Sequence, residues 1–176
     1  MDKKILVTFA TRFGSTEGVA QAIGKTLSEN GLKVDVLPMR EVKDLSIYGG
    51  VVAGSAINGG AWLPEAMLFV ETHRAELAQK PFAIFLVCMT LTMKNAGQYN
   101  NHVAGWLNPI RSLVKPVSEA FFAGALDINK IPSLSDRLKF RLSVLFGVWK
   151  EGDHRDWNAI KKWAIGLIPL LAPQKG

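Results

Sequence analysis

Residues 11–16, Thr-Arg-Phe-Gly-Ser-Thr, place three hydroxyl side chains, one guanidinium and one glycine between two apolar segments. The run at 5–9 predicts a strand, and the segment from Glu17 onwards predicts a helix. Hydroxyls and free backbone N–H groups at a helix N-terminus suit a phosphate, which the helix dipole also attracts. The loop lacks the Gly-Lys-Ser/Thr of a Walker A motif and the glycines of a dinucleotide fingerprint. It predicts a mononucleotide phosphate site with FMN as the leading ligand; the alternative is an ordinary capped turn.

The expected phosphate contacts are Thr11, Arg12, Gly14, Ser15 and Thr16. Arg12 either supplies positive charge to the phosphate or is a solvated residue that contributes only its N–H.

Three further segments are expected around the ring of such a ligand, because each follows an apolar, strand-like run. The predicted contacts are Ser55, Ala56, Ile57, Asn58, Gly59 and Trp62 in one loop, Cys88, Met89 and Thr90 in a second, and Gly124 and Ala125 in a third. Trp62 either stacks on the ring or packs at the start of the next helix. Cys88 is expected to be a buried apolar residue rather than a reactive thiol.

Bulk composition limits the class of protein. A chain of 176 residues is most simply one domain, residues 1–176, and its 48% hydrophobic content is that of a globular protein. The net charge of +6 and the pI of about 9.6 favour anionic partners. Nucleic acid is not expected among them, because no run of Lys and Arg is interleaved with aromatic residues.

The single cysteine, Cys88, excludes disulfides within the chain and a cysteine metal cluster. His73, His102 and His154 lack the spacing of metal ligands, so no metal is expected. A reducing, cytoplasmic setting fits this composition, and the start of the chain shows no signal peptide. The uncharged, mostly apolar runs 81–93 and 163–174 are too short to span a membrane.

Apolar runs alternate with helical patterns along the chain. Strands are expected over 4–10, 32–38, 48–56, 82–87 and 117–125, and helices over 16–30, 64–79, 95–113 and 155–171. This alternation predicts an α/β fold with a doubly wound parallel sheet of five strands. With a phosphate loop after the first strand, the flavodoxin-like order 2-1-3-4-5 is expected.

Residues 127–154 form an insertion that is too long for a plain connection. Its apolar residues recur at helical spacing, which predicts a basic amphipathic helix over 134–149. The stripe consists of Leu134, Leu138, Leu142, Leu145 and Trp149. We expect this helix near the flavin edge, where it either covers the substrate site, rests on an anionic membrane surface, or packs on the domain or a second subunit.

Three segments together resemble the menaquinone-dependent protoporphyrinogen oxidase family, a flavodoxin-like group. They are the loop at 11–16, the segment 51–57 (Val-Val-Ala-Gly-Ser-Ala-Ile) and the strand end 123–126 (Ala-Gly-Ala-Leu). The family also has a long basic insertion that ends in an Asp-Trp pair, which Asp156 and Trp157 match. After the second segment, this chain departs from the family's basic and aromatic pattern with Asn58, Gly59 and Gly60.

The resemblance implies an FMN-dependent oxidoreductase that passes electrons from protoporphyrinogen, or another anionic aromatic substrate, to a quinone. A quinone acceptor would make peripheral contact of this cytoplasmic protein with the inner face of the membrane useful, because quinones reside in lipid. No catalytic residue can be assigned. The alternatives are a flavodoxin-type electron carrier without its own substrate and an NAD(P)H:quinone reductase; such carriers are usually acidic, and the pI of about 9.6 differs from theirs.

Overall fold

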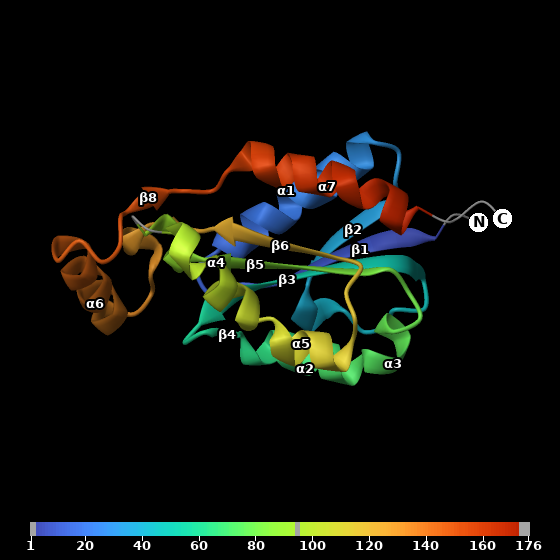
Figure 1. Cartoon of the computed structure of the whole chain (residues 1–176), viewed down its shortest axis with the longest axis horizontal. Coiled ribbons are helices and arrows are strands. Elements are labelled where there is room, and N and C mark those ends of the chain that lie inside the picture. The colour runs from blue at the N-terminus through green and yellow to red at the C-terminus, as the bar shows by residue number, and fades with distance from the viewer. Residues whose placement is uncertain (1–2, 94–95, 173–176) are drawn as a thin grey trace.

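The computed structural model describes residues 3–93 and 96–172. Its central sheet has five parallel strands in the order β2-β1-β3-β5-β6 (Figure 1). They are β1 (Lys4–Ala10), β2 (Val34–Pro38), β3 (Tyr48–Asn58), β5 (Phe82–Cys88) and β6 (Ser118–Ala123). A two-residue strand, β4 (Ala61–Trp62), pairs antiparallel with the end of β3. Counting the parallel strands alone, the expected order 2-1-3-4-5 is confirmed.

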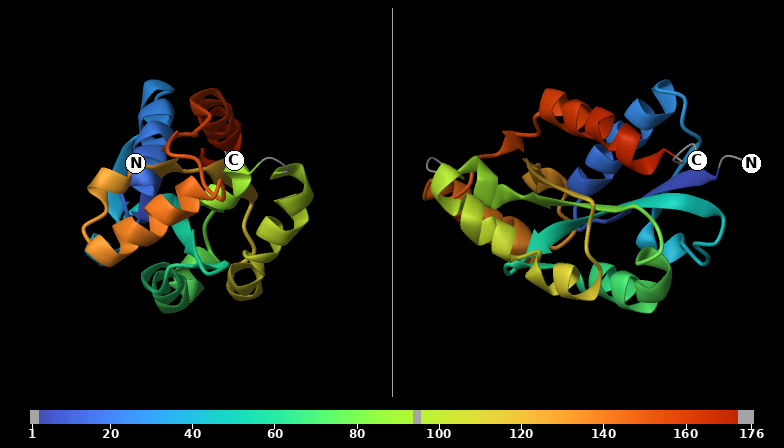
Figure 2. Two further views of the ribbon diagram at one scale, coloured as in Figure 1. Left: turned by 90° about the vertical axis from the view of Figure 1, so that its left-hand side faces the viewer. Right: turned by 45° about the vertical axis from the view of Figure 1, so that its right-hand side comes forward.

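The strands form where the sequence is continuously apolar, because helices cover both faces of the sheet. Every residue of β5 is buried, as are all residues of β1 after Lys4. One face packs on α1 (Ser15–Glu29) and α7 (Trp157–Leu171). The other face packs on α2 (Pro64–Thr72), α3 (Arg74–Leu77), α4 (Ala96–Gly105) and α5 (Asn108–Leu113). Figure 2 shows these two layers above and below the sheet.

Several expected boundaries are wrong. The helix expected over 64–79 is broken at His73 into α2 and α3, and the helix expected over 95–113 is broken before α5. Pro109 lies in the first turn of α5, where its missing N–H costs nothing, whereas a continuous helix would lose a hydrogen bond there. The last strand ends at Ala123, and residues 125–126 instead form β7 (Ala125–Leu126), which pairs with β8 (Gly152–Asp153).

The insertion folds into a 3-10 turn, η3 (Ile128–Lys130), then α6 (Leu134–Leu145), and returns through β8. Ser133 caps α6 by accepting a hydrogen bond from the N–H of Asp136 at 3.3 Å. The helix ends four residues before the expected boundary, and Trp149 lies beyond it. In Figures 1 and 2, α6 lies at the end of the molecule toward which the carboxyl ends of the parallel strands point. Among the described residues, no helix is long and apolar enough to cross a membrane.

The close packing of β3 on β5 yields a testable substitution. A Cβ at Gly54 would lie 2.0 Å from a ring atom of Phe85, which is fully buried. We expect Gly54→Ala to lower the free energy of unfolding in urea by about 1–3 kcal/mol through overpacking. Gly166→Ala on α7 is the matched control, since nothing lies near its Cβ; it should raise stability by about 0.5–1 kcal/mol. Equal effects of the two substitutions would contradict this packing.

Candidate functional site

The loops expected to hold a ligand leave the sheet at one edge. Ala10, the last residue of β1, pairs with Ser55 of β3, and Cys88 at the end of β5 pairs with Ala123 of β6. Because all four strands are parallel, their following loops emerge together. Ligands of open α/β sheets bind at this edge, next to the strand where the order reverses, which is β1 here.

The loop after β1 has the geometry of an anion site. Gly14 adopts a left-handed conformation with φ of 88°, and its N–H donates to Thr11 Oγ1 at 3.0 Å. This turn starts α1 at Ser15, so the N–H groups of its first turn face the loop. Thr16 is fully buried, and its hydroxyl has no hydrogen-bond partner in the described part of the chain. A buried, unpaired hydroxyl at a helix N-terminus fits a phosphate oxygen that would accept from it.

Beside this loop lies a cavity of about 120 Å³. Most of the predicted ligand contacts line it: Arg12, Ser15, Ala56, Ile57, Asn58, Cys88, Met89, Gly124 and Ala125. The structure adds Phe13, Val87, Leu126 and Phe140. Of these four, Phe140 comes from α6, so the inserted helix forms part of the wall. Sequence spacing placed this helix near the site but did not identify the residue that reaches it.

Other predicted contacts lie away from this cavity. Trp62 is only 3% exposed and belongs to the hydrophobic core, as the packing alternative expects; its stacking on a ring stays a prediction. Ser55 is also buried; its hydroxyl accepts from the N–H of Leu63 at 3.0 Å and donates to the Ala56 carbonyl at 2.8 Å. Gly59 forms the turn between β3 and β4 with φ of 61°, and Thr90 lies half-buried in a 3-10 turn, η2 (Met89–Thr92).

Arg12 ties α6 to the cavity. Its guanidinium donates to Asn58 Oδ1 at 3.2 Å and to Asp136 Oδ2 at 3.3 Å, which joins three segments. The neighbouring Phe13 meets Phe140 edge-to-face, with ring centroids 6.1 Å apart. The partly exposed ion pair contributes no more than about 1 kcal/mol, so α6 is held mainly by apolar contacts. The proposed contact of Arg12 with a phosphate stays a prediction.

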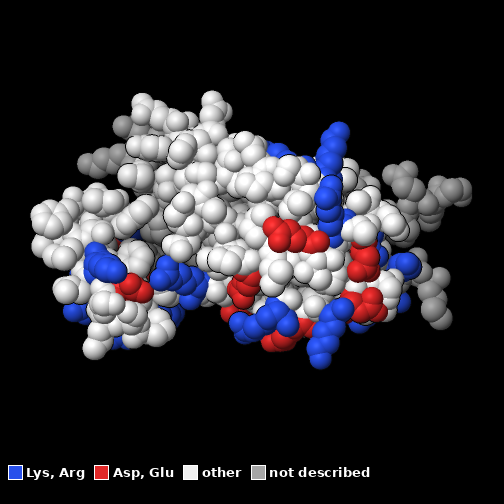
Figure 3. Space-filling model, turned by 90° about the horizontal axis from the view of Figure 1, so that it is seen from below, with Lys and Arg blue, Asp and Glu red and all other residues white. Residues whose placement is uncertain are grey.

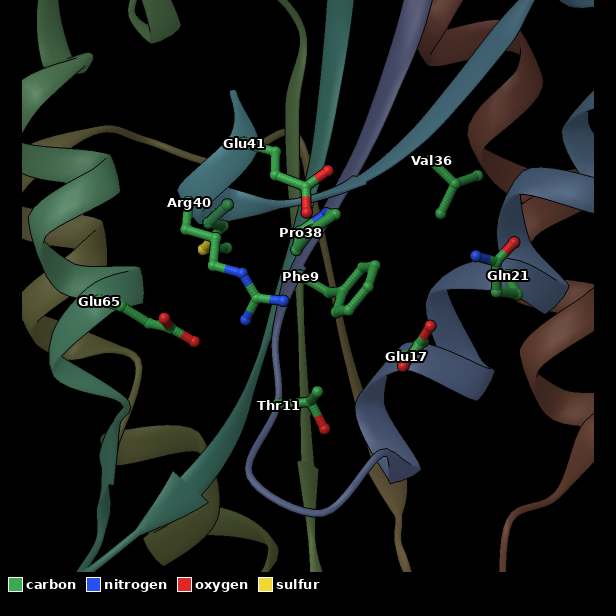
Figure 4. Close-up of a pocket in the computed structure, with 10 residues that line it drawn as sticks. Phe9, Thr11, Glu17, Gln21, Val36, Pro38, Arg40, Glu41 and Glu65 are labelled. Carbon is green, nitrogen blue, oxygen red and sulfur yellow. The ribbon is translucent and has the colours of Figure 1, made fainter. Parts of the chain in front are cut away.

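A second cavity, of about 240 Å³, lies on the β2 side of the loop (Figure 4). Thr11 lines it, together with three carboxylates and one guanidinium: Glu17, Glu41, Glu65 and Arg40. This excess of negative charge disfavours a phosphate. The side of the loop that carries Ser15 and the first cavity therefore suits an anion better.

Arg155 was not predicted as a site residue. It donates to the backbone carbonyl of Ser15 at 3.3 Å and to both oxygens of Asp153 at 2.8 Å. These bonds hold the pKa of Asp153 below its ordinary value. A Cβ at Gly18 would lie 2.3 Å from Arg155 Nη1, so glycine at this helical position lets a cation lie against the first turn of α1. In the sequence, only Gly18, one turn into α1, indicated that another side chain approaches this helix closely.

Because the buried hydroxyl of Thr16 has no partner within the described residues, we expect its removal to weaken the binding of FMN. Thr16→Val removes the donor and keeps the shape, and it should weaken FMN binding roughly 10- to 100-fold, the usual effect of losing a hydrogen bond to a charged group. Thr26→Val on the same helix is the control, because Thr26 donates to the Ala22 carbonyl at 2.8 Å, away from the loop. Fluorescence titration with FMN measures both. Unchanged affinity in Thr16→Val would contradict the phosphate assignment.

Burial of Cys88 predicts an inert thiol. Desolvation raises the pKa of Cys88 above its ordinary value, so the neutral thiol persists in the folded protein. At about pH 8 an exposed thiol is partly ionised, and Cys88 should react with a disulfide reagent at least about tenfold more slowly than in the guanidinium-unfolded chain. Because the pKa of Cys88 is higher in the folded protein, its contribution to stability is fully present below the unfolded pKa. It is lost as pH rises through the folded pKa. Equal reaction rates would show a reactive thiol.

Several solved structures of flavodoxins have a similar fold. The chain is similar to a short-chain flavodoxin associated with a non-canonical PDU bacterial microcompartment, with TM-score 0.60 and 13% identity over 98% of this chain and 100% of that one. It is also similar to a point mutant of the flavodoxin from Pseudomonas aeruginosa, with TM-score 0.57 and 12% identity over 96% and 98%. A Fusobacterium nucleatum flavodoxin mutant bound to flavin mononucleotide gives TM-score 0.51 and 14% identity over 69% and 70%. At these identities the likeness shows the fold alone.

The comparison with curated proteins gave no match. A family model of the flavodoxin domain matches residues 6–147, which is more than half of the 176 residues. The chain therefore belongs to the flavodoxin domain family, and FMN is its cofactor.

Proposed function

We propose that this protein is an FMN-dependent electron carrier that exchanges electrons with other redox proteins. The observation that carries the proposal is the anion site at 11–16, with its buried, unpaired Thr16 hydroxyl, next to a cavity at the carboxyl edge of the sheet. Bound there, FMN supplies reversible one- and two-electron transfer. The loops at 11–16 and 55–58 would hold its phosphate and ring, while α6 shields one side from water.

The charge of the chain indicates the kind of redox partner. A net charge of +6 favours docking to an acidic protein surface, as electrostatic complementarity raises the rate of encounter. Electron transfer from such a donor should slow as ionic strength rises, because salt screens the attraction between exposed charges.

A second candidate is an oxidoreductase with its own substrate, and a third cavity favours it. This cavity of about 500 Å³ lies between η2, α4 and the segment after α6, and it is within the size range of ligand pockets. Tyr99 and Trp149 line it with flat aromatic surfaces. Lys150 supplies a cation for a substrate carboxylate, and Glu151 also lines the cavity. Trp149 packs against the same small cluster (Leu126, Ile128 and Ile131) as Met89 and Phe140, which line the first cavity. An anionic aromatic substrate such as protoporphyrinogen, with a quinone as acceptor, fits this chemistry.

Anaerobic reduction of the FMN-loaded protein, followed by absorbance, separates these functions. The carrier proposal predicts reduction by a ferredoxin or a flavodoxin reductase and none by protoporphyrinogen. Reduction by protoporphyrinogen with reoxidation by menaquinone would favour the oxidoreductase, and direct oxidation of NAD(P)H would indicate a quinone reductase. A protein that binds no FMN would contradict all three.

Lys150→Gln tests whether the third cavity binds substrate. If it does, this variant should need roughly 10-fold more porphyrinogen for half-maximal flavin reduction, from the loss of a charge-assisted hydrogen bond. Reduction by ferredoxin should be unchanged. Lys25→Gln, on α1 and away from this cavity, is the control. An equal effect of the two substitutions would show that the third cavity does not bind the substrate.

A further inference from the structure

The leucine stripe of the insertion faces away from the protein. Leu134, Leu138 and Leu145 are 77%, 60% and 77% exposed, and Phe146, directly after α6, is 76% exposed. Leu142 and Val148 are exposed as well. Half of the exposed large apolar side chains in the described residues thus lie within 15 positions, Leu134 to Val148. An apolar patch of this kind marks an interaction surface.

The opposite side of the same helix already has its partner. Phe140 and Val144 pack with Phe13 and Met89 against the small cluster of Leu126, Ile128 and Ile131. The leucines recur at spacings of four, four and three, which places them on one face, opposite Phe140. The expectation that this stripe packs on the domain is therefore wrong for the leucines, and only Trp149 packs inward.

Positive charges border this exposed face. At 3.6 residues per turn, Lys139 and Arg141 fall on opposite sides of the leucine stripe, and both are exposed. Residues 134–150 hold four basic side chains and one acidic one, a net charge of +3. Figure 3 shows Lys and Arg, with an acidic group between them, among mostly uncharged atoms at the end of the molecule where α6 lies. Long cationic side chains beside an apolar stripe can reach phosphate groups while the stripe enters the acyl region.

We propose that α6 docks this protein on anionic lipid bilayers, with its leucines in the interface and Lys139 and Arg141 on lipid phosphates. A single helix at the extreme end of the molecule can lie on a plane without obstruction from the rest of the fold (Figure 1). A second copy is a poorer occupant, because a two-fold contact would bring the same basic side chains together. Docking here brings the wall residue Phe140, on the inner side of α6, within one helix diameter of the lipid.

Sedimentation with vesicles tests the proposal on the whole FMN-loaded protein. The wild type should sediment with vesicles of phosphatidylglycerol and phosphatidylcholine at low salt, and much less with phosphatidylcholine alone or at high salt. Lys139→Gln with Arg141→Gln should lower the partition coefficient roughly 30-fold. Leu138→Gln with Leu145→Gln, which leaves the charge unchanged, should lower it about tenfold or more.

Leu68→Gln on α2 is the matched control, because Leu68 is another exposed helical leucine far from α6 in the chain. It should sediment like the wild type. Flavin absorbance and melting temperature show that each variant keeps its fold and its cofactor, so failure of docking is distinguishable from failure of the FMN site. Three results would overturn the proposal: wild type that stays in the supernatant, a control that loses binding equally, or a wild-type dimer that the leucine variant converts to monomer.

Discussion

The parallel pairing of β1 with β3 determines where every functional group of this protein lies. Because Ala10 is in register with Ser55, the loop at 11–16 and the loop after β3 leave the sheet as neighbours. The order of strands reverses at β1, which opens the crevice that a mononucleotide needs. The left-handed Gly14 and the buried hydroxyl of Thr16 then lie together at the N-terminus of α1, where the helix dipole is positive. Loss of this register would separate these groups, whatever their chemistry.

The two sides of the inserted helix α6 lie in different surroundings. Its inner side completes the cavity wall through Phe140 and holds the phosphate loop through Asp136 and Arg12. Its outer side presents leucines that no described part of the chain covers. The same helix therefore lines the cavity and forms the exposed surface, so a movement of α6 would change the shape of both.

The sheet was predictable because strands covered on both faces must be continuously apolar, and such runs are easy to recognise. The turn from β1 into α1 was predictable because hydroxyls, one glycine and a helix start lie together in six residues. Periodicity could not show which side of α6 faces the protein, because both Phe140 and Leu138 belong to apolar positions and only tertiary packing separates them. The same limit applies to Trp62, whose type suits both stacking and core packing. Arg155 was missed because its partner, the Ser15 carbonyl, lies 140 residues earlier in the chain.

The central claim is that the loop at 11–16 recognises the phosphate of the cofactor. Comparing FMN with riboflavin, which has the same ring and no phosphate, tests it directly in the wild-type protein by calorimetric titration. The account predicts that FMN binds about 100-fold or more tightly than riboflavin, since several charge-assisted hydrogen bonds depend on the phosphate. Equal affinity for the two compounds would show that the ring alone is recognised and would contradict the account.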